Sequence, residues 1–261
     1  MKPSLKKNVS KFNNDVSAKG GYEYTMNGRY SSVISNQRIT DETIKLLQKI
    51  PNLKTVIDIG CGDGTYTNYL ANKFNDVKFT GFDPAEEAVA KAKERYPKCS
   101  FAVGDILDAA SAPQAKYDVA IIRGVLHHLS IQSRAIENAL LLSDNILIIE
   151  PNGNNPILKW IEKHSQYHIE HEEQSFSSLF LQHICLANSM TIEYVSFIGF
   201  VPFFFPTPAA RLIYFFQPLL ERIPCLGYQF GAQIVIHAKK RVPQTKKKVS
   251  LPLRSHETST K

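Results

Sequence analysis

A glycine-rich turn between an apolar run and an amphipathic run constrains this chain more than any other feature. The apolar run covers residues 55–59, and the turn reads DIGCGDG over residues 58–64. Glycine lets a backbone bend sharply and lets a ligand approach it closely. A helix that starts after such a turn directs its free N–H groups and its partial positive charge at that ligand. The segment therefore predicts a strand, a ligand-binding turn and a helix that begins at Thr65.

Alternating apolar and amphipathic runs continue this pattern along the chain. We expect strands at residues 55–59, 77–82, 100–103, 118–122, 145–149, 191–198 and 233–238. We expect helices at residues 35–50, 65–74, 85–96, 131–142 and 176–189. Continuous apolar strands separated by amphipathic helices indicate a parallel sheet that is covered on both faces. The predicted fold is a doubly wound, mostly parallel α/β sheet of seven strands.

Three further polar segments follow the next three predicted strands. Asp83 and Pro84 follow the second strand, the sequence GDI at residues 104–106 follows the third, and the fourth leads into Arg123 and Gly124. Open α/β sheets bind ligands at the carboxyl ends of their strands. A carboxylate at Asp83 is suited to accept hydrogen bonds from both hydroxyls of a ribose, or alternatively to cap the helix that follows.

In this order, the four segments resemble the cofactor-binding motifs of class I S-adenosylmethionine-dependent methyltransferases. The resemblance covers residues 33–150 and implies a Rossmann-like methyltransferase fold, with S-adenosylmethionine as cofactor and S-adenosylhomocysteine as product. It implies that the glycine turn makes room for the methionine and ribose parts, that Asp58 anchors the amino group, and that residues 104–106 contact the adenine. The implied cofactor-binding residues are Asp58, Gly60, Cys61, Gly62, Gly64, Asp83, Pro84, Gly104, Asp105, Ile106, Arg123 and Gly124. Thr65 stands where the dinucleotide pattern GxGxxG has its last glycine, which disfavours a second hypothesis, an NAD-dependent oxidoreductase.

Histidines are the candidate catalytic bases, because their usual pKa lies near neutral pH. The resemblance implies that His127 and His128, which follow the fourth strand, border the methyl acceptor, and His168 is a third candidate. The alternative is that His127 and His128 only orient their loop or pack beneath the cofactor.

Polar residues after the fifth strand, together with tyrosines near the N-terminus, are the candidates for contact with the acceptor. The predicted substrate residues are Tyr22, Tyr24, Glu150, Asn152 and His171. The spacing of His168 and His171 also allows a metal site completed by Glu150 or Glu172. No zinc-hydrolase spacing such as HExxH is present, and we predict no metal.

We divide the chain into an N-terminal lid or lead-in at residues 1–32, a methyltransferase domain at 33–238 and a basic tail at 239–261. Insertions at residues 151–175 and 199–230 are expected to form the acceptor side. The second insertion is strongly apolar, but prolines and Arg211 interrupt it, so it lacks the roughly 20 apolar residues of a membrane-spanning helix. It is expected to be a helix pair with its aromatic side chains in the core. The alternative is a lid that lines an apolar acceptor pocket or dips into a membrane interface.

The net charge of +7 belongs to the end of the chain and not to the folded body. Residues 239–261 hold eight of the 31 Lys and Arg residues and one of the 24 acids. This composition predicts a disordered tail, with contact to an anionic surface as the alternative. The neutral body, and RGVL in place of an NPPY tetrapeptide after the fourth strand, disfavour a nucleic-acid partner.

We therefore expect methyl transfer to an oxygen or nitrogen atom of a small or lipid-linked, hydrophobic acceptor. A non-catalytic, membrane-associated protein that binds S-adenosylmethionine is an alternative on the same fold. The four cysteines share no close spacing, and residues 1–15 lack the apolar stretch of a secretory signal. These features favour reduced thiols in a cytoplasmic protein, with peripheral contact at the membrane left open.

Overall fold

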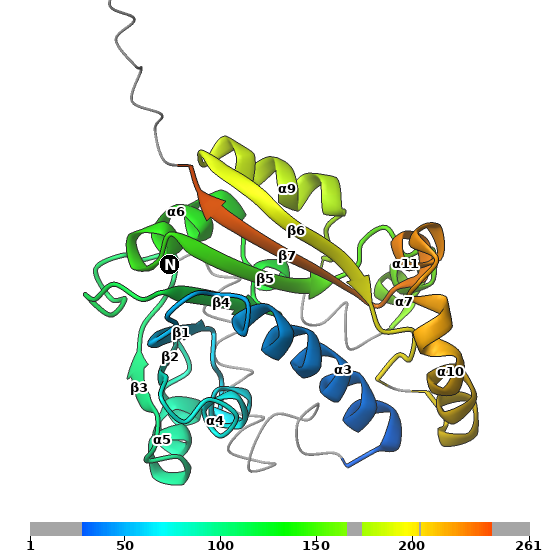
Figure 1. Cartoon of the computed structure of the whole chain (residues 1–261), viewed down its shortest axis with the longest axis horizontal. Helices are drawn as coiled ribbons and strands as arrows, with labels where there is room; N and C mark the ends of the chain where they lie inside the picture. The colour runs from blue at the N-terminus through cyan, green and yellow to red at the C-terminus, as the bar shows by residue number, and fades with distance from the viewer. Residues whose placement is uncertain (1–27, 166–173, 204, 242–261) are drawn as a thin grey trace, which may run out of the picture.

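A seven-stranded sheet forms the centre of the computed structural model, which describes residues 28–165, 174–203 and 205–241 (Figure 1). The strands are β1 (Thr55–Ile59), β2 (Lys78–Asp83), β3 (Ser100–Val103), β4 (Val119–Arg123), β5 (Asn145–Pro151), β6 (Met190–Ile198) and β7 (Gln233–Lys240). Their order is β3-β2-β1-β4-β5-β7-β6. Strand β7 runs antiparallel to both β5 and β6, and the other neighbouring strands pair in parallel. The predicted doubly wound, mostly parallel sheet is confirmed.

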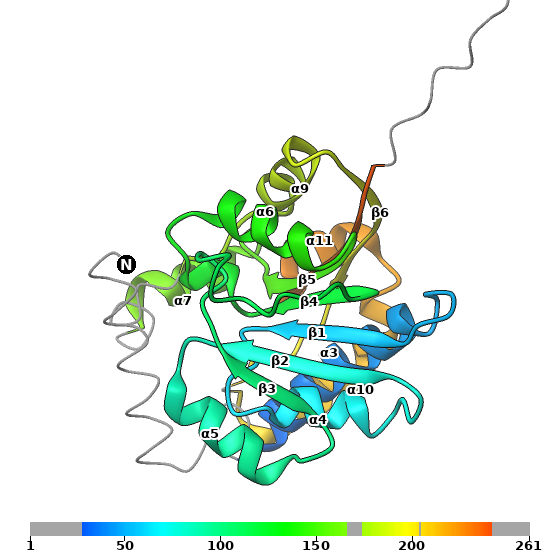
Figure 2. The same cartoon turned by 90° about the vertical axis from the view of Figure 1, so that its left-hand side faces the viewer.

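Helices cover both faces of this sheet, as Figures 1 and 2 show. They are α3 (Tyr30–Leu47), α4 (Thr65–Ala71), α5 (Glu86–Arg95), α6 (Gln132–Leu142), α7 (Pro156–His164), α9 (Ser178–Ala187), α10 (Thr207–Leu220) and α11 (Pro224–Phe230). Side chains of α3 and α4 share one buried cluster with one face of the sheet. Side chains of α6 and α9 share a second cluster with the other face. Because successive side chains of a strand point to opposite faces of the sheet, each buried strand contributes side chains to both clusters.

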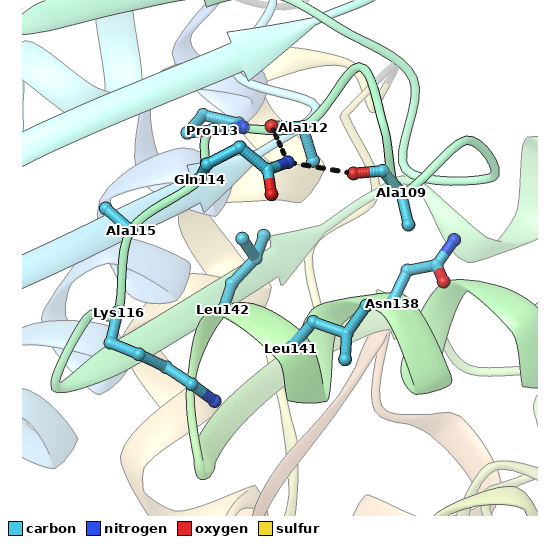
Figure 3. Close-up of a pocket in the computed structure, with 9 residues that line it drawn as sticks. All are labelled: Ala109, Ala112, Pro113, Gln114, Ala115, Lys116, Asn138, Leu141 and Leu142. Atoms are coloured by element: carbon cyan, nitrogen blue, oxygen red, sulfur yellow. Dashed lines mark hydrogen bonds between the residues drawn. The ribbon is translucent and has the colours of Figure 1, made fainter.

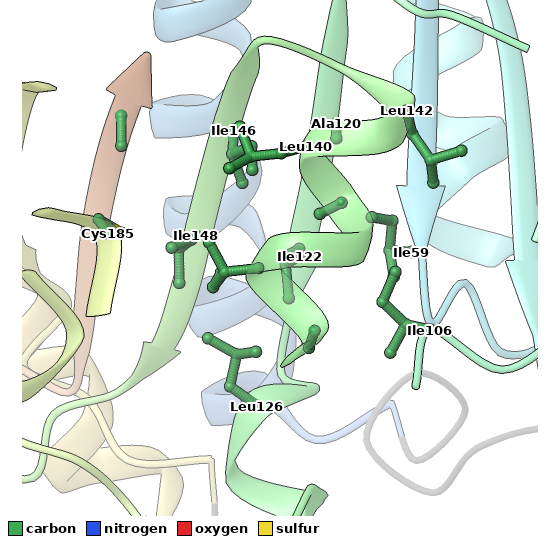
Figure 4. Close-up of a cluster of buried hydrophobic side chains, with 14 of the residues drawn as sticks. Ile59, Ile106, Ala120, Ile122, Leu126, Leu140, Leu142, Ile146, Ile148 and Cys185 are labelled. Carbon is green, nitrogen blue, oxygen red and sulfur yellow. The ribbon is translucent and has the colours of Figure 1, made fainter. Parts of the chain in front are cut away.

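The core on the α6 and α9 side is built from branched aliphatic side chains (Figure 4). Ile59, Ile122 and Ile148 come from three adjacent parallel strands and are at most 1% exposed. Burying a side chain of this size contributes roughly 1.5–3 kcal/mol each. These side chains fix the register of the strands, and hence the positions of the loops at their carboxyl ends.

The observed elements differ from the predicted ones mainly outside the first five strands. Helix α3 begins at Tyr30, five residues before the predicted start, and helix α7 lies in an insertion where we had expected no element. The sequence did carry a signal for α7, because Asn155 followed by a proline is a favourable helix start. The Asn155 side chain accepts hydrogen bonds from the N–H groups of Ile157 and Leu158. Strand β7 also continues through Lys240, into the segment predicted as tail.

The apolar insertion at residues 199–230 forms α10 and α11, but most of its large side chains lie at the surface. Phe215 is 77% exposed and Leu212 is 63% exposed. The helix pair is therefore present, and Phe203 and Phe205 before α10 pack against buried clusters, but the aromatic side chains of α10 itself do not enter the core. Within the described residues, no helix combines the length and the apolarity that a membrane crossing requires.

Candidate functional site

The predicted cofactor motifs meet at the carboxyl ends of β1, β2, β3 and β4. The strand order reverses between β1 and β4, so their crossover helices lie on opposite faces of the sheet. A doubly wound sheet leaves a crevice for a ligand at such a point. The loops that follow these strands are therefore the place where a bound molecule is expected.

The glycine turn at residues 60–64 has the conformation that only glycine adopts without strain. Gly60, Gly62 and Gly64 have φ angles of 73°, 55° and 75°. A Cβ atom added at Gly64 would lie 2.7 Å from the ring of Phe101 and 2.8 Å from the Cβ of Ala92. The backbone N–H of Gly60 donates to the carbonyl of Phe82 at 2.8 Å, which ties the turn to the end of β2. Side chains are thus excluded at Gly60 and Gly64 by both conformation and packing.

Asp58 is a buried carboxylate directly beneath this turn. It is 2% exposed and accepts a hydrogen bond from the Thr67 hydroxyl at 2.5 Å. The pKa of Asp58 is raised to about 6, chiefly by burial and less by the charge of Asp83, whereas the Thr67 hydrogen bond and the charge of Arg123 oppose this shift. A buried carboxylate with so few donors is poised to accept a bond from a positively charged group.

Asp83 connects the end of β2 to the glycine turn. One carboxylate oxygen accepts from the N–H of Gly62 at 2.9 Å, and the other accepts from the N–H of Ala85 at 2.8 Å. Pro84 lies between Asp83 and that second donor. Burial raises the pKa of Asp83 to about 6, against the effect of the two backbone donors. The N-cap of α5 is Ala85 and receives no side-chain cap, and each oxygen of Asp83 retains a further lone pair that could accept from a ribose hydroxyl.

The loop after β3 is held in place from both sides. The N–H of Gly104 donates to the carbonyl of Asp83 at 3.1 Å, and the side chain of Asp105 accepts from the N–H of Leu107 at 2.8 Å. Ile106 is buried, and its carbonyl accepts from the Asn138 side chain at 2.6 Å. Asp105 itself stays half-buried. The structure thus brings the third motif beside the first two.

Arg123 and Gly124 end β4 next to the same crevice. The guanidinium of Arg123 lies 4.1 Å from the centre of the Tyr66 ring and donates to the Asn36 side chain at 2.5 Å. Gly124 has a φ angle of 65°, and its N–H donates to the carbonyl of Ile149. Sequence reasoning missed Asn36 and Tyr66. Tyr66 carried a signal, since it lies in the first turn after the glycines, but nothing in the sequence connects Asn36 with β4.

Glu150 and His127 form a buried pair at the ends of β5 and β4. One Glu150 oxygen accepts from the N–H groups of Val125 and Leu126, each at 2.8 Å. The other lies 2.7 Å from Nδ1 of His127. The His128 ring packs against that of His127, with centres 3.9 Å apart. Glu150, predicted to contact the acceptor, is 0% exposed and instead holds the short 3-10 helix Leu126–His128.

Asn152, a second predicted substrate residue, is also fully buried. Its amide donates to the carbonyls of Tyr228 and Gly231 at 3.0 and 2.9 Å, and its oxygen accepts from the N–H of Asn154. This placement favours a structural role, in which Asn152 ties the end of β5 to α11. The other predicted residues of the acceptor side and the third candidate base lie outside the described residues: Tyr22, Tyr24, His168 and His171.

A pocket of about 230 Å³ lies elsewhere, between residues 109–116 and α6 (Figure 3). Gln114 closes one side of it by donating to the carbonyls of Ala109 and Ala112 at 3.1 and 2.8 Å. The pocket adjoins the amino ends of β4 and β5 and contains none of the motif residues. Since ligands of open α/β sheets bind at the carboxyl ends, we assign it no role in the reaction.

Comparison with known sequences identifies one domain and partial relatives. Residues 56–141 match the sequence model of the family described as Methyltransferase domain. The trans-aconitate 2-methyltransferase of Variovorax paradoxus is 32% identical over 127 residues, which are 45% of this chain and 48% of the relative. That of Escherichia coli is 35% identical over 65 residues, which are 24% of this chain and 26% of the relative. The chain thus spans about half or less of the length of these curated relatives.

Comparison with solved structures extends the likeness to nearly the whole chain. Magnesium protoporphyrin IX methyltransferase from Synechocystis PCC 6803, solved with S-adenosylmethionine, has a TM-score of 0.58 at 16% identity and covers 90% of this chain and 97% of its own. The plantazolicin methyltransferase BamL, solved with a triazolic analogue and S-adenosylhomocysteine, has a TM-score of 0.59 at 18% identity and covers 91% and 96%. At these identities, the likeness establishes the fold.

Proposed function

Because this chain belongs, through residues 56–141, to the class I S-adenosylmethionine-dependent methyltransferases, we propose that it catalyses methyl transfer from that cofactor. The acceptor in this proposal is an oxygen or nitrogen atom of a small or lipid-linked, hydrophobic molecule, and the second product is S-adenosylhomocysteine. The observation that carries the proposal is the joining of three carboxylate-bearing loops around one glycine turn. Asp58, Asp83 and Asp105 lie at the ends of β1, β2 and β3, and hydrogen bonds link each loop to the next.

The residues present fit S-adenosylmethionine. Its amino group would meet the buried carboxylate of Asp58, its ribose hydroxyls that of Asp83, and its adenine the loop at residues 104–106. A Cβ at Gly60 or Gly64 would clash with neighbouring protein side chains, so these glycines let the turn pack closely against the loops that would hold the cofactor. Bound in this way, the cofactor would supply an activated methyl group, and the protein's task would be to align the acceptor and to exclude water. Alignment of two reactants contributes up to roughly 7–11 kcal/mol.

His127 is the described side chain that best suits a general base. A carboxylate accepts hydrogen bonds, so Glu150 fixes the proton of a neutral His127 on Nδ1 and leaves the lone pair on Nε2. The backbone donors that hold Glu150 also hold the orientation of the imidazole. In this proposal Nε2 removes the proton of the acceptor, and Glu150 acts only by positioning His127.

Titration of the purified chain with S-adenosylmethionine and with NADH tests the cofactor. We expect S-adenosylmethionine to bind, and Asp83→Ala to weaken its binding by at least about tenfold through loss of a charge-assisted hydrogen bond. Asp76→Ala is the matched control, since Asp76 is exposed just before the amino end of β2, opposite to Asp83, and should leave affinity unchanged. Binding of NADH without S-adenosylmethionine would reject the proposal in favour of an oxidoreductase.

Incubation of small-molecule and lipid extracts with isotopically labelled S-adenosylmethionine tests the transfer and names the acceptor. We expect label in a hydrophobic or small product, detected by mass spectrometry. With that acceptor, His127→Ala should lower kcat by about 10²–10⁴-fold, the usual range for a general base, while affinity for S-adenosylmethionine stays the same. His128→Ala should have a smaller effect. Cofactor binding without label in either extract would instead support a non-catalytic binding protein.

A further inference from the structure

The outer side of α10 and the start of α11 form a continuous apolar surface, which we call the α10 face. Figure 1 shows α10 at the edge of the molecule, beside α3 and away from the sheet. The side chains of the α10 face are Leu212, Phe215, Phe216, Leu219 and Ile223, and each is between 39% and 77% exposed. Large contiguous apolar patches are rare on soluble monomers and mark interaction sites.

The orientation of α10 is fixed, so this exposure is built into the fold. Ala210 and Gln217 are buried on the inner side of the helix, against α3 and the loop after β6. Gln217 accepts a hydrogen bond from the N–H of Phe200 at 3.0 Å. At the end of α10, Glu221 accepts from the N–H of Gly199 and pairs with Arg38 of α3 at 2.8 Å. These contacts hold the apolar side of α10 outward.

The exposed charges within the α10 and α11 segment itself have one sign. Between residues 205 and 230, the exposed charged side chains are Arg211 and Arg222, near the two ends of α10. The single acid of this stretch, Glu221, is turned inward to Arg38. An apolar face flanked by arginines and free of exposed acids is the pattern of a helix that lies in an anionic membrane interface.

The same charges disfavour a second copy of the chain as the partner. In a two-fold symmetric contact each face meets itself, so two pairs of arginines would be brought together with no acid on either face to neutralise them. Helix α10 is too short to span a bilayer. Its 14 residues extend about 21 Å at about 1.5 Å per residue, whereas the hydrocarbon core of a bilayer is about 30 Å thick.

We propose that the α10 face docks the protein on an anionic lipid surface, with α10 parallel to the membrane and its arginines at the headgroups. This docking does not rest on methyl transfer and would hold for a binding protein on the same fold. Anionic headgroups supply the complementary charge, and the apolar side chains supply the area to be buried. Phe215 and Leu212 are the most exposed members and would insert most deeply.

Co-sedimentation of the full chain with lipid vesicles tests this proposal. We expect the protein to bind vesicles of phosphatidylcholine mixed with phosphatidylglycerol, and to bind pure phosphatidylcholine vesicles much more weakly. Leu212→Ser combined with Phe215→Ser should weaken binding to the mixed vesicles by at least tenfold, since both side chains would otherwise be buried in lipid. Arg211→Gln and Arg222→Gln should each weaken it by about fivefold, which corresponds to about 1 kcal/mol per charge.

The matched control is Leu179→Ser combined with Leu186→Ser on α9, where both side chains are also exposed. This variant should bind as the unmodified chain does. If the Leu212 and Phe215 variant binds mixed vesicles without loss, another part of the chain, such as its basic end, accounts for binding and the proposal is wrong. It is also wrong if sedimentation velocity shows a dimer that this variant dissociates, because the α10 face would then serve a second copy.

Discussion

The part of the molecule around β1, β2 and β3, which we call the cofactor half, buries charged side chains. The part after β5, which we call the acceptor half, exposes apolar side chains. Asp58 and Asp83 are buried in the first region, while Phe215 and Leu212 face solvent in the second. Burying a carboxylate costs folding free energy, and leaving an aromatic ring in water forgoes the stabilisation that its burial would bring. Such local departures from a consistent fold are expected where a ligand or a partner completes the structure. The first region is built for a polar ligand, and the second for an apolar one.

The largest effect among the glycines of the cofactor half is expected at Gly64, which has no room for a side chain. Gly64→Ala should lower the free energy of unfolding by about 2–5 kcal/mol, combining the cost of a positive φ with that of overpacking against Phe101. Gly28→Ala is the control, because Gly28 also has a positive φ but nothing within 4 Å of an added Cβ. It should cost only about 1–2 kcal/mol. Urea unfolding of both variants measures the difference, and equal losses would show that packing at the turn contributes nothing.

In the acceptor half, the strongest constraint is the amide of Asn152. Asn152→Ala should lower the free energy of unfolding by about 1–3 kcal/mol, because the carbonyl of Tyr228 loses its side-chain donor and that of Gly231 keeps only the longer bond from Asn155. Asn154→Ala should cost less, since the Asn154 side chain donates only to the Ser178 hydroxyl at 3.3 Å. Thermal unfolding of the two variants measures the difference between their losses of stability. A stable Asn152→Ala protein with impaired turnover would instead support the predicted contact with substrate.

The two halves also differ in how much of them the sequence predicted. The glycine turn, Asp83 and residues 104–106 each follow a strand directly, so strand patterning and local motifs sufficed to place them on one edge of the sheet. Their roles as cofactor contacts stay a prediction. The burial of Glu150 and Asn152 was not predictable in the same way, because it depends on loops and strands up to 79 residues away in sequence. Residues of that half interact through tertiary packing, which leaves no periodic or spacing signal.

Asp58 gives the cofactor half a predicted pH dependence. Burial is the main cause that raises its pKa to about 6 from its usual 3.8, so at neutral pH the folded protein carries an ionised carboxylate at a cost. Asp58→Asn should therefore raise the free energy of unfolding of the cofactor-free protein at pH 7 by on the order of 1–3 kcal/mol. The gain should shrink as the pH falls through 6 and disappear near pH 4, where the folded and unfolded states both bind the proton.

The same variant should lose affinity for S-adenosylmethionine, because an amide attracts the cofactor's amino group less than a carboxylate does. In the unmodified chain, affinity should fall as the pH drops below about 6, where Asp58 takes up a proton. Chemical unfolding across this pH range and calorimetric titration at each pH measure both effects. A loss of stability at pH 7 in Asp58→Asn would mean that the bond from Thr67 outweighs the cost of burial.

The smallest effect on folding is expected on the α10 face. Phe215→Ala should change the free energy of unfolding by less than about 0.5 kcal/mol, because the ring is 77% exposed and loses little burial. Phe79→Ala, at a ring that is 2% exposed beneath α3 and α4, should cost about 3–5 kcal/mol. The same substitution thus separates an aromatic side chain that the fold needs from one that it does not use. If Phe215→Ala proved as costly as Phe79→Ala, the ring would be buried in the free protein, and the α10 face would not be available to a membrane.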